Sequence, residues 1–221
     1  MKMTRDEFDK RNRENRLHVA LIGMSNSGKS MTASKWNSEL GFSVFVVDEA
    51  INRSLGLATM SEAANWMGYP FEEHYQERKN RYLSLEREFS KVAIPVDNNF
   101  VLDATGSLIY GDSGLLDWVR EHFLVVGIDV GERFINEMVE DFFENPKAVV
   151  WQSEFKPLDD ELDTQALRRC YPRLLKNRSL GYERLADVQI SADLTRDPEI
   201  TGAELLSIIR EELALDAPSG A

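Results

Sequence analysis

Short apolar runs alternate along this chain with longer segments in which apolar residues recur at helical spacing. The apolar runs, rich in Val, Ile and Phe, span residues 17–22, 42–47, 100–102, 123–128 and 187–190. The segments of helical spacing span residues 31–40, 72–89, 132–143, 164–180 and 199–213. Strands that are apolar on both faces and alternate with helices indicate a parallel sheet with right-handed crossovers. The pattern therefore predicts a doubly wound α/β domain.

Two stretches depart from this alternation. Residues 50–90 have helical character throughout, and because this is too long for one crossover we predict a helical insert at residues 49–91. The pattern stops between residues 145 and 163, where Pro146, Pro157 and an acidic cluster predict a loop. A long ordered loop in a compact domain often closes over a site, so we expect a lid at residues 145–163.

The length of 221 residues and the hydrophobic content of 43% are those of a single domain that builds its core without disulfides. We expect this domain at residues 17–215, after a charged N-terminal extension at 1–16 and before a flexible tail at 216–221. The formal net charge of −12 argues against general binding of nucleic acid or of an anionic membrane, because both need a positive surface. A polyanionic ligand must therefore find a local basic site.

Cysteine content and the N-terminal residues bear on location. Cys170 is the only cysteine, which excludes an intrachain disulfide and a thiolate zinc cluster and is typical of a reducing compartment. Residues 1–16 are densely charged and lack an apolar core, the opposite of a secretory signal. The sequence has no uncharged apolar run of about 18 residues. We therefore expect a cytoplasmic protein without a membrane span.

The first apolar run leads directly into residues 23–30, Gly-Met-Ser-Asn-Ser-Gly-Lys-Ser, which fit the pattern G-x-x-x-x-G-K-S/T between a strand and a helix. Gly23 and Gly28 allow the backbone to turn so that N–H groups point inward, and the helix N-terminus adds positive potential. Lys29 would neutralise charge on the β- and γ-phosphates, and the Ser30 hydroxyl would bind Mg²⁺. The expected phosphate contacts of this P-loop are Gly23, Ser25, Asn26, Ser27, Gly28, Lys29, Ser30 and Met31.

A P-loop indicates a nucleotide but does not indicate the reaction. The Asn-Lys-x-Asp run with which GTPases read guanine is absent from the sequence, and the chain is too short for a large motor ATPase. The size, the helical insert after the second strand and the lid-like loop are typical of a kinase. In such an enzyme a small-molecule or nucleotide substrate binds beside the γ-phosphate of ATP.

Three further segments carry a family resemblance. The second apolar run ends in Val-Val-Asp at 46–48, and the third is followed by Ala-Thr-Gly-Ser at 104–107. Arg178, Tyr182 and Ala186 form an Arg-x-x-x-Tyr-x-x-x-Ala pattern. With the P-loop, these segments resemble the shikimate kinase family of P-loop kinases over residues 17–213. The first two segments read Asp-x-Asp and Thr-Gly-Gly-Gly in that family, and the third is unchanged.

The resemblance implies a fold and roles for these residues. It implies a five-stranded parallel sheet in the order 2-3-1-4-5, flanked by helices, with a substrate-binding insert and a lid. Asp48 matches the family's second Asp and is the expected hydroxyl-binding carboxylate, while Arg178 is the expected clamp on a substrate carboxylate. Gly106 is the surviving glycine of the substrate loop. Alternatively, Asp48 could only cap a strand end, and Arg178 could pair with Glu183.

One departure from the family pattern concerns the metal. Val46 stands in place of the family's first Asp, which helps to hold Mg²⁺, and Val46 cannot do so. Asp103 ends the third apolar run, and in other P-loop proteins a carboxylate placed there lies beside the P-loop Ser at the magnesium ion. We therefore expect Ser30 and Asp103 to hold Mg²⁺; the alternative is that Asp103 only caps the strand-end turn.

Two basic groups of the family also lack a direct match. The early carboxylate-binding Arg aligns near Tyr75, so its role moves to Arg78 or is lost. The lid's Arg-Pro-Leu-Leu is replaced by Asn-Pro-Lys at 145–147, and we expect Lys147 to supply the positive charge of the lid. The other candidates are Lys156, Arg168 and Arg169. The acidic stretch that follows would repel a triphosphate if it closed over it.

The residues and the resemblance together predict an ATP- and Mg²⁺-dependent kinase that phosphorylates a hydroxyl of a compact, carboxylated substrate. The resemblance implies shikimate and aromatic amino acid biosynthesis. Lys29 and Mg²⁺ would offset developing charge, Asp48 would orient or deprotonate the hydroxyl, and lid closure would exclude water. Two alternatives stay open: a kinase of another polyol or sugar acid, and a nucleotide-binding regulator or pseudokinase. We expect a hydroxy-acid partner, no nucleic acid or membrane, and a monomer or weak homodimer.

Overall fold

The computed structural model describes residues 3–214. The predicted tail at 216–221 therefore lies outside the described residues. The strands are β1 (His18–Gly23), β2 (Ser43–Val46), β3 (Phe100–Asp103), β4 (Leu124–Asp129) and β5 (Val188–Ser191). The helices are α1 (Arg5–Arg13), α2 (Lys29–Leu40), α3 (Val47–Ser54), α4 (Met60–Met67), α5 (Tyr75–Ser90), the 3₁₀ helix η1 (Leu108–Tyr110), α6 (Ser113–His122), α7 (Gly131–Glu144), α8 (Asp163–Leu185), α9 (Ala192–Thr195) and α10 (Gly202–Glu212).

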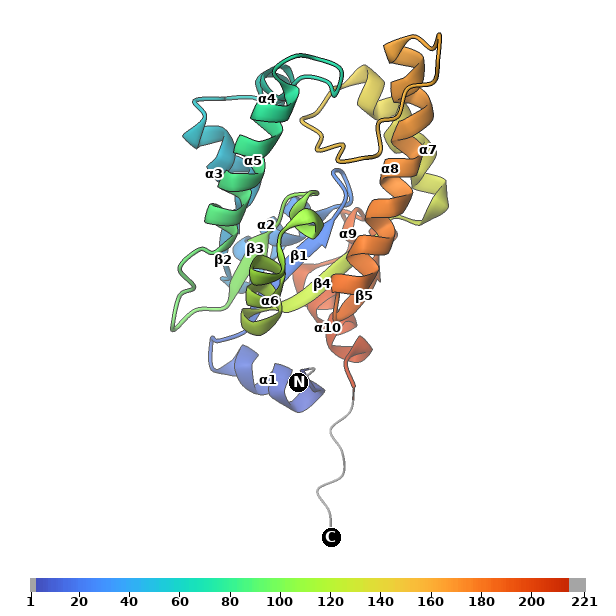
Figure 1. The fold of residues 1–221 in the computed structure, drawn as a ribbon. Coiled ribbons are helices and arrows are strands. Elements are labelled where there is room, and N and C mark those ends of the chain that lie inside the picture. Colours follow the sequence, from blue (N-terminus) through green and yellow to red (C-terminus); the bar gives the residue numbers. More distant parts are fainter. Residues whose placement is uncertain (1–2, 215–221) are drawn as a thin grey trace.

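The strands form one parallel sheet in the order β2-β3-β1-β4-β5, which confirms the predicted order (Figure 1). β1 lies at the centre, and its consecutive residues Val19, Ala20, Leu21 and Ile22 are all fully buried. A parallel strand that is covered by helices on both faces needs apolar residues at successive positions rather than at alternate ones. This burial is the reason why the first apolar run of the sequence predicts a strand.

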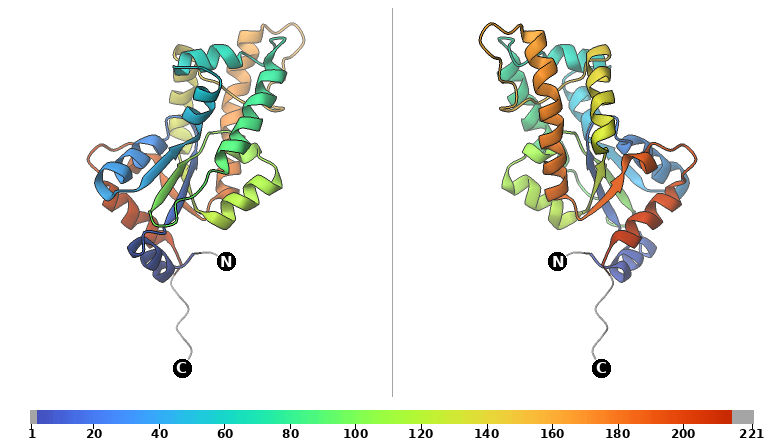
Figure 2. Two further views of the ribbon diagram at one scale, coloured as in Figure 1. Left: turned by 90° about the vertical axis from the view of Figure 1, so that its left-hand side faces the viewer. Right: turned by 90° about the vertical axis from the view of Figure 1, so that its right-hand side faces the viewer.

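Helices cover both faces of the sheet, as the α/β pattern predicts. Helices α2 and α10 pack on one face, and α6 and α8 pack on the other (Figure 2). The fully buried Trp36 of α2 donates from Nε1 to the Gly202 carbonyl at the start of α10, over 2.9 Å. Helix α6 was not among the predicted segments, because its buried apolar side chains are only Leu115 and Val119, too few to form a clear helical pattern.

The segment predicted as a helical insert is not one continuous helical stretch. Helices α3, α4 and α5 are separated by breaks, and Gly56 and Gly68 each have a φ of +71° there. Glycine adopts this left-handed conformation without steric cost and ends a helix. The expectation of helix throughout residues 50–90 is therefore wrong at residues 55–59 and 68–74. In Figure 1, α4 and α5 rise beyond the carboxyl ends of the strands, opposite α7 and α8.

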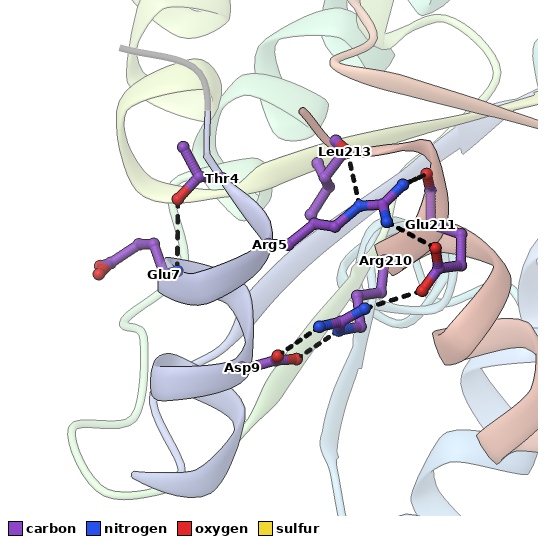
Figure 3. Close-up of polar contacts among 7 residues, drawn as sticks. All are labelled: Thr4, Arg5, Glu7, Asp9, Arg210, Glu211 and Leu213. Carbon is purple, nitrogen blue, oxygen red and sulfur yellow. Dashed lines mark hydrogen bonds and ion pairs between the residues drawn. The ribbon is translucent and has the colours of Figure 1, made fainter. Parts of the chain in front are cut away.

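Most of the predicted charged extension forms helix α1, which packs against α10. Phe8 is the buried side chain of α1. Asp9 accepts two hydrogen bonds of 2.7 Å from the guanidinium of Arg210, and Arg5 Nε donates to the Leu213 carbonyl over 3.0 Å (Figure 3). These contacts lie at the amino ends of the strands, away from the P-loop (Figure 1). None of the helices between residues 3 and 214 has the length and hydropathy needed to cross a bilayer.

Candidate active site

A cavity of about 690 Å³ opens at the carboxyl ends of the strands, the place where open parallel sheets bind ligands. Its walls come from the P-loop, helices α3, α4, α5, α7 and α8, the loop after β3, and residues 147–150 of the predicted lid. Its charged lining residues are Lys29, Asp48, Glu49, Asp103, Asp141, Lys147, Arg178 and Arg196. The fold thus brings the P-loop, the candidate metal residue and the candidate acceptor residues to one cavity.

The P-loop turns tightly against helix α9. Gly28 precedes α2 with a φ of +95°, and a Cβ atom at this position would lie 2.6 Å from Oγ1 of Thr195. The Thr195 hydroxyl donates to the Ser27 carbonyl over 2.6 Å and so holds the loop from behind. Ser27 is fully buried, and neither it nor Gly23 lines the cavity. The other six predicted phosphate-binding residues of the P-loop line it: Ser25, Asn26, Gly28, Lys29, Ser30 and Met31.

Lys29 lies inside the P-loop. Its Nζ donates to the carbonyls of Gly23 and Met24 over 3.1 and 2.8 Å, and the residue is 7% exposed. Burial lowers the pKa of the Lys29 amine, and the negative charges of Asp103 and Asp48 oppose this effect. A cation that has been partly removed from water interacts strongly with a phosphate that enters the same space.

Ser30 and Asp103 form a pair at the floor of the cavity. The Ser30 hydroxyl donates to Asp103 Oδ2 over 2.6 Å, and Asp103 is 3% exposed. In the sheet, Asp103 stands opposite Leu21 of β1 and Val46 of β2, which puts it beside the P-loop. Burial raises the pKa of the Asp103 carboxyl, while Lys29 and Ser30 lower it. A carboxylate and a hydroxyl so placed fit a Mg²⁺ ion that keeps other oxygen ligands from phosphate and water.

The remaining part of the cavity carries Asp48 and Arg178. Asp48 lies in the first turn of α3 and not at the end of β2 as expected, because β2 ends at Val46. Its Oδ1 accepts a hydrogen bond of 2.5 Å from the Tyr82 hydroxyl. Arg178 is buried in α8, and its Nη2 donates to the Val150 carbonyl over 2.9 Å. Both side chains line the cavity, so it contains both a carboxylate and a guanidinium.

Gly106 lines the same cavity, next to Arg178. A Cβ atom on Gly106 would be 3.1 Å from Arg178 Nη1, and the Tyr182 hydroxyl donates to the Gly106 carbonyl over 2.6 Å. Arg178 and Tyr182 of the Arg-x-x-x-Tyr pattern therefore both lie against the loop after β3. Arg78, in contrast, is half-buried on α5 and does not line the cavity.

The Tyr75 hydroxyl binds the backbone of the predicted lid, a contact that the sequence did not predict. Its buried hydroxyl donates to the Val149 carbonyl over 3.1 Å and accepts from the Trp151 N–H over 2.7 Å. With the hydrogen bond from Arg178 to Val150, three successive residues of the predicted lid are held by α5 and α8. Val149, Val150 and Trp151 are buried as well. The beginning of the predicted lid is thus packed against the domain.

Glu86 is a buried carboxylate that the sequence analysis missed. It is 1% exposed and accepts hydrogen bonds from the hydroxyls of Thr105 and Ser107 in the loop after β3. Burial raises its pKa to about 7, and the charge of Asp48 adds to this effect. Tyr82 and Glu86 lie four positions apart on α5 and therefore on one face, a spacing that could have indicated an inward-facing polar group.

Lys147 is the predicted lid cation that reaches the cavity. Its Nζ lies 2.7 Å from Asp141 Oδ2, and its side chain is 16% exposed. The other three candidates do not line the cavity. Arg169 pairs with Glu161 over 2.6 Å and donates to the Lys156 carbonyl, while Arg168 pairs with Glu140 over 3.6 Å. Part of the acidic lid stretch is therefore already neutralised by α8.

Comparison with known proteins places this fold. No protein-family model and no curated protein matches the sequence. Shikimate kinase from Aquifex aeolicus has a TM-score of 0.52 and 19% identity, over 88% of this chain and 97% of that chain. The enzyme from Bacteroides thetaiotaomicron has a TM-score of 0.55 and 14% identity, over 88% of this chain and 97% of that chain. The enzyme from Acinetobacter baumannii, in complex with shikimate, has a TM-score of 0.53 and 16% identity, over 89% of this chain and 92% of that chain. This chain therefore has the P-loop kinase fold of these shikimate kinases, at a sequence identity of 14–19%.

Proposed function

We propose that this protein is an ATP-dependent kinase that transfers the γ-phosphoryl group to a hydroxyl of a small carboxylated substrate, with shikimate as the first candidate. One observation carries the proposal: a single cavity is lined by Lys29 of the P-loop, by the pair Ser30 and Asp103, and by Asp48 and Arg178. In this proposal, separate groups within the one cavity bind the phosphates, the metal ion and the acceptor. The proposed cytoplasmic location and monomeric or weakly dimeric state rest on the sequence alone.

Each group has a distinct task in the proposed reaction. Lys29 binds the β- and γ-phosphates and offsets the charge that develops on them during transfer. Ser30 and Asp103 would hold Mg²⁺, which supplies charge neutralisation between the phosphate oxygens. Asp48 orients the acceptor hydroxyl or takes its proton, and the Tyr82 hydroxyl fixes the direction of the Asp48 carboxylate. Residues 147–150 shield this side of the cavity from water.

Arg178 is the group that selects the acceptor in this proposal. A guanidinium can bind a carboxylate through two parallel hydrogen bonds, which a neutral sugar cannot accept in the same way. Arg178 is buried in α8 and held by the Val150 carbonyl, so its position does not depend on the substrate. Because both side chains line the cavity, an acceptor with a hydroxyl and a carboxylate could bind Asp48 through the first group and Arg178 through the second.

A coupled assay of ADP release tests this function with a panel of hydroxylated ring acids, sugar acids, neutral sugars and nucleosides. We expect substrate-dependent ADP release with a carboxylated acceptor, a KM for that acceptor raised strongly by Arg178→Ala, and a kcat lowered mainly by Asp48→Asn. Arg178→Lys, which keeps the charge but loses the fork, should give an intermediate KM. Arg173→Ala is the matched control, because Arg173 lies on the same helix but pairs with Glu154 outside the cavity.

Lys29→Met should abolish the transfer while leaving the fold intact, because Met is an unbranched side chain of similar length that carries no charge. Turnover within about tenfold of the wild-type rate would contradict the proposed role of the P-loop. A neutral sugar or a nucleoside that reacts better than every acid, with Arg178→Ala indifferent, would contradict the proposed substrate class. Tight ATP binding without turnover on any acceptor would identify a nucleotide-binding regulator instead.

A further inference from the structure

Asp141 is a carboxylate in the wall of the cavity that has no part in the function described so far. It lies in the last turn of α7, and its side chain is 34% exposed. Asn26 of the P-loop donates from Nδ2 to Asp141 Oδ2 over 2.7 Å, and Lys147 Nζ donates to the same oxygen over 2.7 Å. One carboxylate oxygen thus joins the P-loop to the base of the predicted lid, although Asn26 and Asp141 are 115 positions apart.

A negative charge at this place is unfavourable for a phosphate-binding site unless it has another task. Asn26, Asp141 and Lys147 all line the cavity that holds Lys29. Lys29 and Lys147 line the same cavity, and the charge of Lys147 adds a minor part to the lowering of the Lys29 pKa, of which burial is the main cause. The hydrogen bond from Lys147 is the largest cause of the lowered pKa of Asp141. The lowered pKa keeps Asp141 ionised, and its hydrogen bond with Lys147 holds the amine at the cavity.

We propose that Asp141 is a positioning residue that holds Lys147 beside the P-loop, so that the amine is in place when nucleotide phosphates enter. Asn26 contributes by fixing the Asp141 carboxylate relative to the P-loop. The phosphates then take over Lys147 as a hydrogen-bond donor, and an amine that is already in place loses less freedom on binding than one on a free chain. This proposal rests on the proposed function only in requiring that ATP binds at the P-loop.

The electrostatic alternative predicts the opposite result. If Asp141 is only a nearby negative charge, its removal relieves repulsion and tightens ATP binding. If Asp141 positions Lys147, its removal weakens ATP binding. The two ideas therefore differ in the sign of one measurable quantity, the Kd of Mg²⁺-ATP.

The experiment is calorimetric titration of Mg²⁺-ATP into the full chain and its variants. We expect Asp141→Asn to raise the Kd about tenfold, the loss of one charge-assisted hydrogen bond, without a change in melting temperature. Lys147→Met should raise it at least as much, and the double variant should bind no more weakly than Lys147→Met alone, because Asp141 acts through Lys147. Glu140→Gln is the matched control: it removes a carboxylate from the adjacent position of α7 that does not line the cavity, and it should leave the Kd unchanged.

Several results would overturn the proposal. A Kd of Asp141→Asn equal to or below that of the wild type would show that Asp141 does not position the amine, and so would additive effects of the two single changes. An equal rise in Glu140→Gln would assign the effect to the net charge of α7. If Asp141→Asn fails to fold, Asn26→Ala replaces it. A Kd that Asn26→Ala raises in the wild type but not in Lys147→Met supports the proposal, and an unchanged Kd overturns it. A wild-type chain that does not bind Mg²⁺-ATP overturns both this proposal and the proposed function, whereas normal wild-type binding with an unaffected Asp141→Asn overturns this one alone.

Discussion

Replacing Glu86 by Gln should change how the stability of this protein depends on pH. Glu86 is buried between α5 and the loop after β3, and its Oε1 accepts hydrogen bonds from Thr105 and Ser107. Burial raises its pKa to about 7, so the folded protein holds a proton that the unfolded chain has already lost at pH 6. Gln keeps the accepting oxygen and the shape but does not titrate. The variant therefore isolates the contribution of this one carboxyl group.

The sign and size of the effect follow from linkage. An acid whose pKa is raised in the folded state does not lower the free energy of unfolding at a pH well below its unfolded pKa. As the pH rises from the unfolded pKa through the folded pKa, the free energy of unfolding falls. A pKa raised from 4.5 to about 7 destabilises the folded state by about 3 kcal/mol at a pH where Glu86 is ionised in both the folded and the unfolded protein. About 2.5 kcal/mol of this change falls between pH 5 and pH 8.

The measurement is the free energy of unfolding in urea, at pH 5 and at pH 8, for the wild type and two variants. We expect the difference between Glu86→Gln and the wild type to shift by about 2.5 kcal/mol in favour of the variant as the pH rises from 5 to 8. Glu88→Gln is the control, because Glu88 lies on the exposed side of the same helix, and its curve should run parallel to that of the wild type. A parallel curve for Glu86→Gln as well would refute the reasoning, since it would mean that Glu86 titrates as an ordinary carboxyl.

Three further variants test other parts of the structure. Gly28→Ala should abolish ATP binding and lower the melting temperature, because its Cβ would meet Thr195 at 2.6 Å; calorimetry with ATP and a thermal scan check this. Asp103→Asn should raise the Mg²⁺ concentration for half-maximal activity, and an unchanged Mg²⁺ dependence would leave Asp103 a structural residue. Asp9→Asn should lower the melting temperature at pH 7. The difference from the wild type should shrink with added salt and as the pH falls through the pKa of Asp9, which the hydrogen bonds from Arg210 lower.

The elements that could be predicted from the sequence are those whose cause is local. Residues 23–30 carry the whole P-loop pattern, because a turn of this kind depends on the residues that form it. The continuous apolar runs predicted the parallel strands, because burial on both faces acts on every residue of β1. The resemblance to shikimate kinases added the strand order, which the sheet confirms. The two glycines, Gly56 and Gly68, could have indicated where the helices end, but the helical pattern of the residues around them favoured one continuous helical segment.

The sites that only the tertiary structure decided are those whose partners lie far apart along the chain. Thr195 holds the P-loop from 168 positions away, and Asn26 meets Asp141 across 115 positions. Tyr75 holds the backbone of Val149 and Trp151, and Glu86 is buried where α5 meets the loop after β3. A spacing rule reports which residues share a face of one element, but it does not report what the opposite element brings to that face. The local sequence therefore determines the P-loop and the strands. Packing between distant elements determines which carboxylates are buried and which cations reach the cavity.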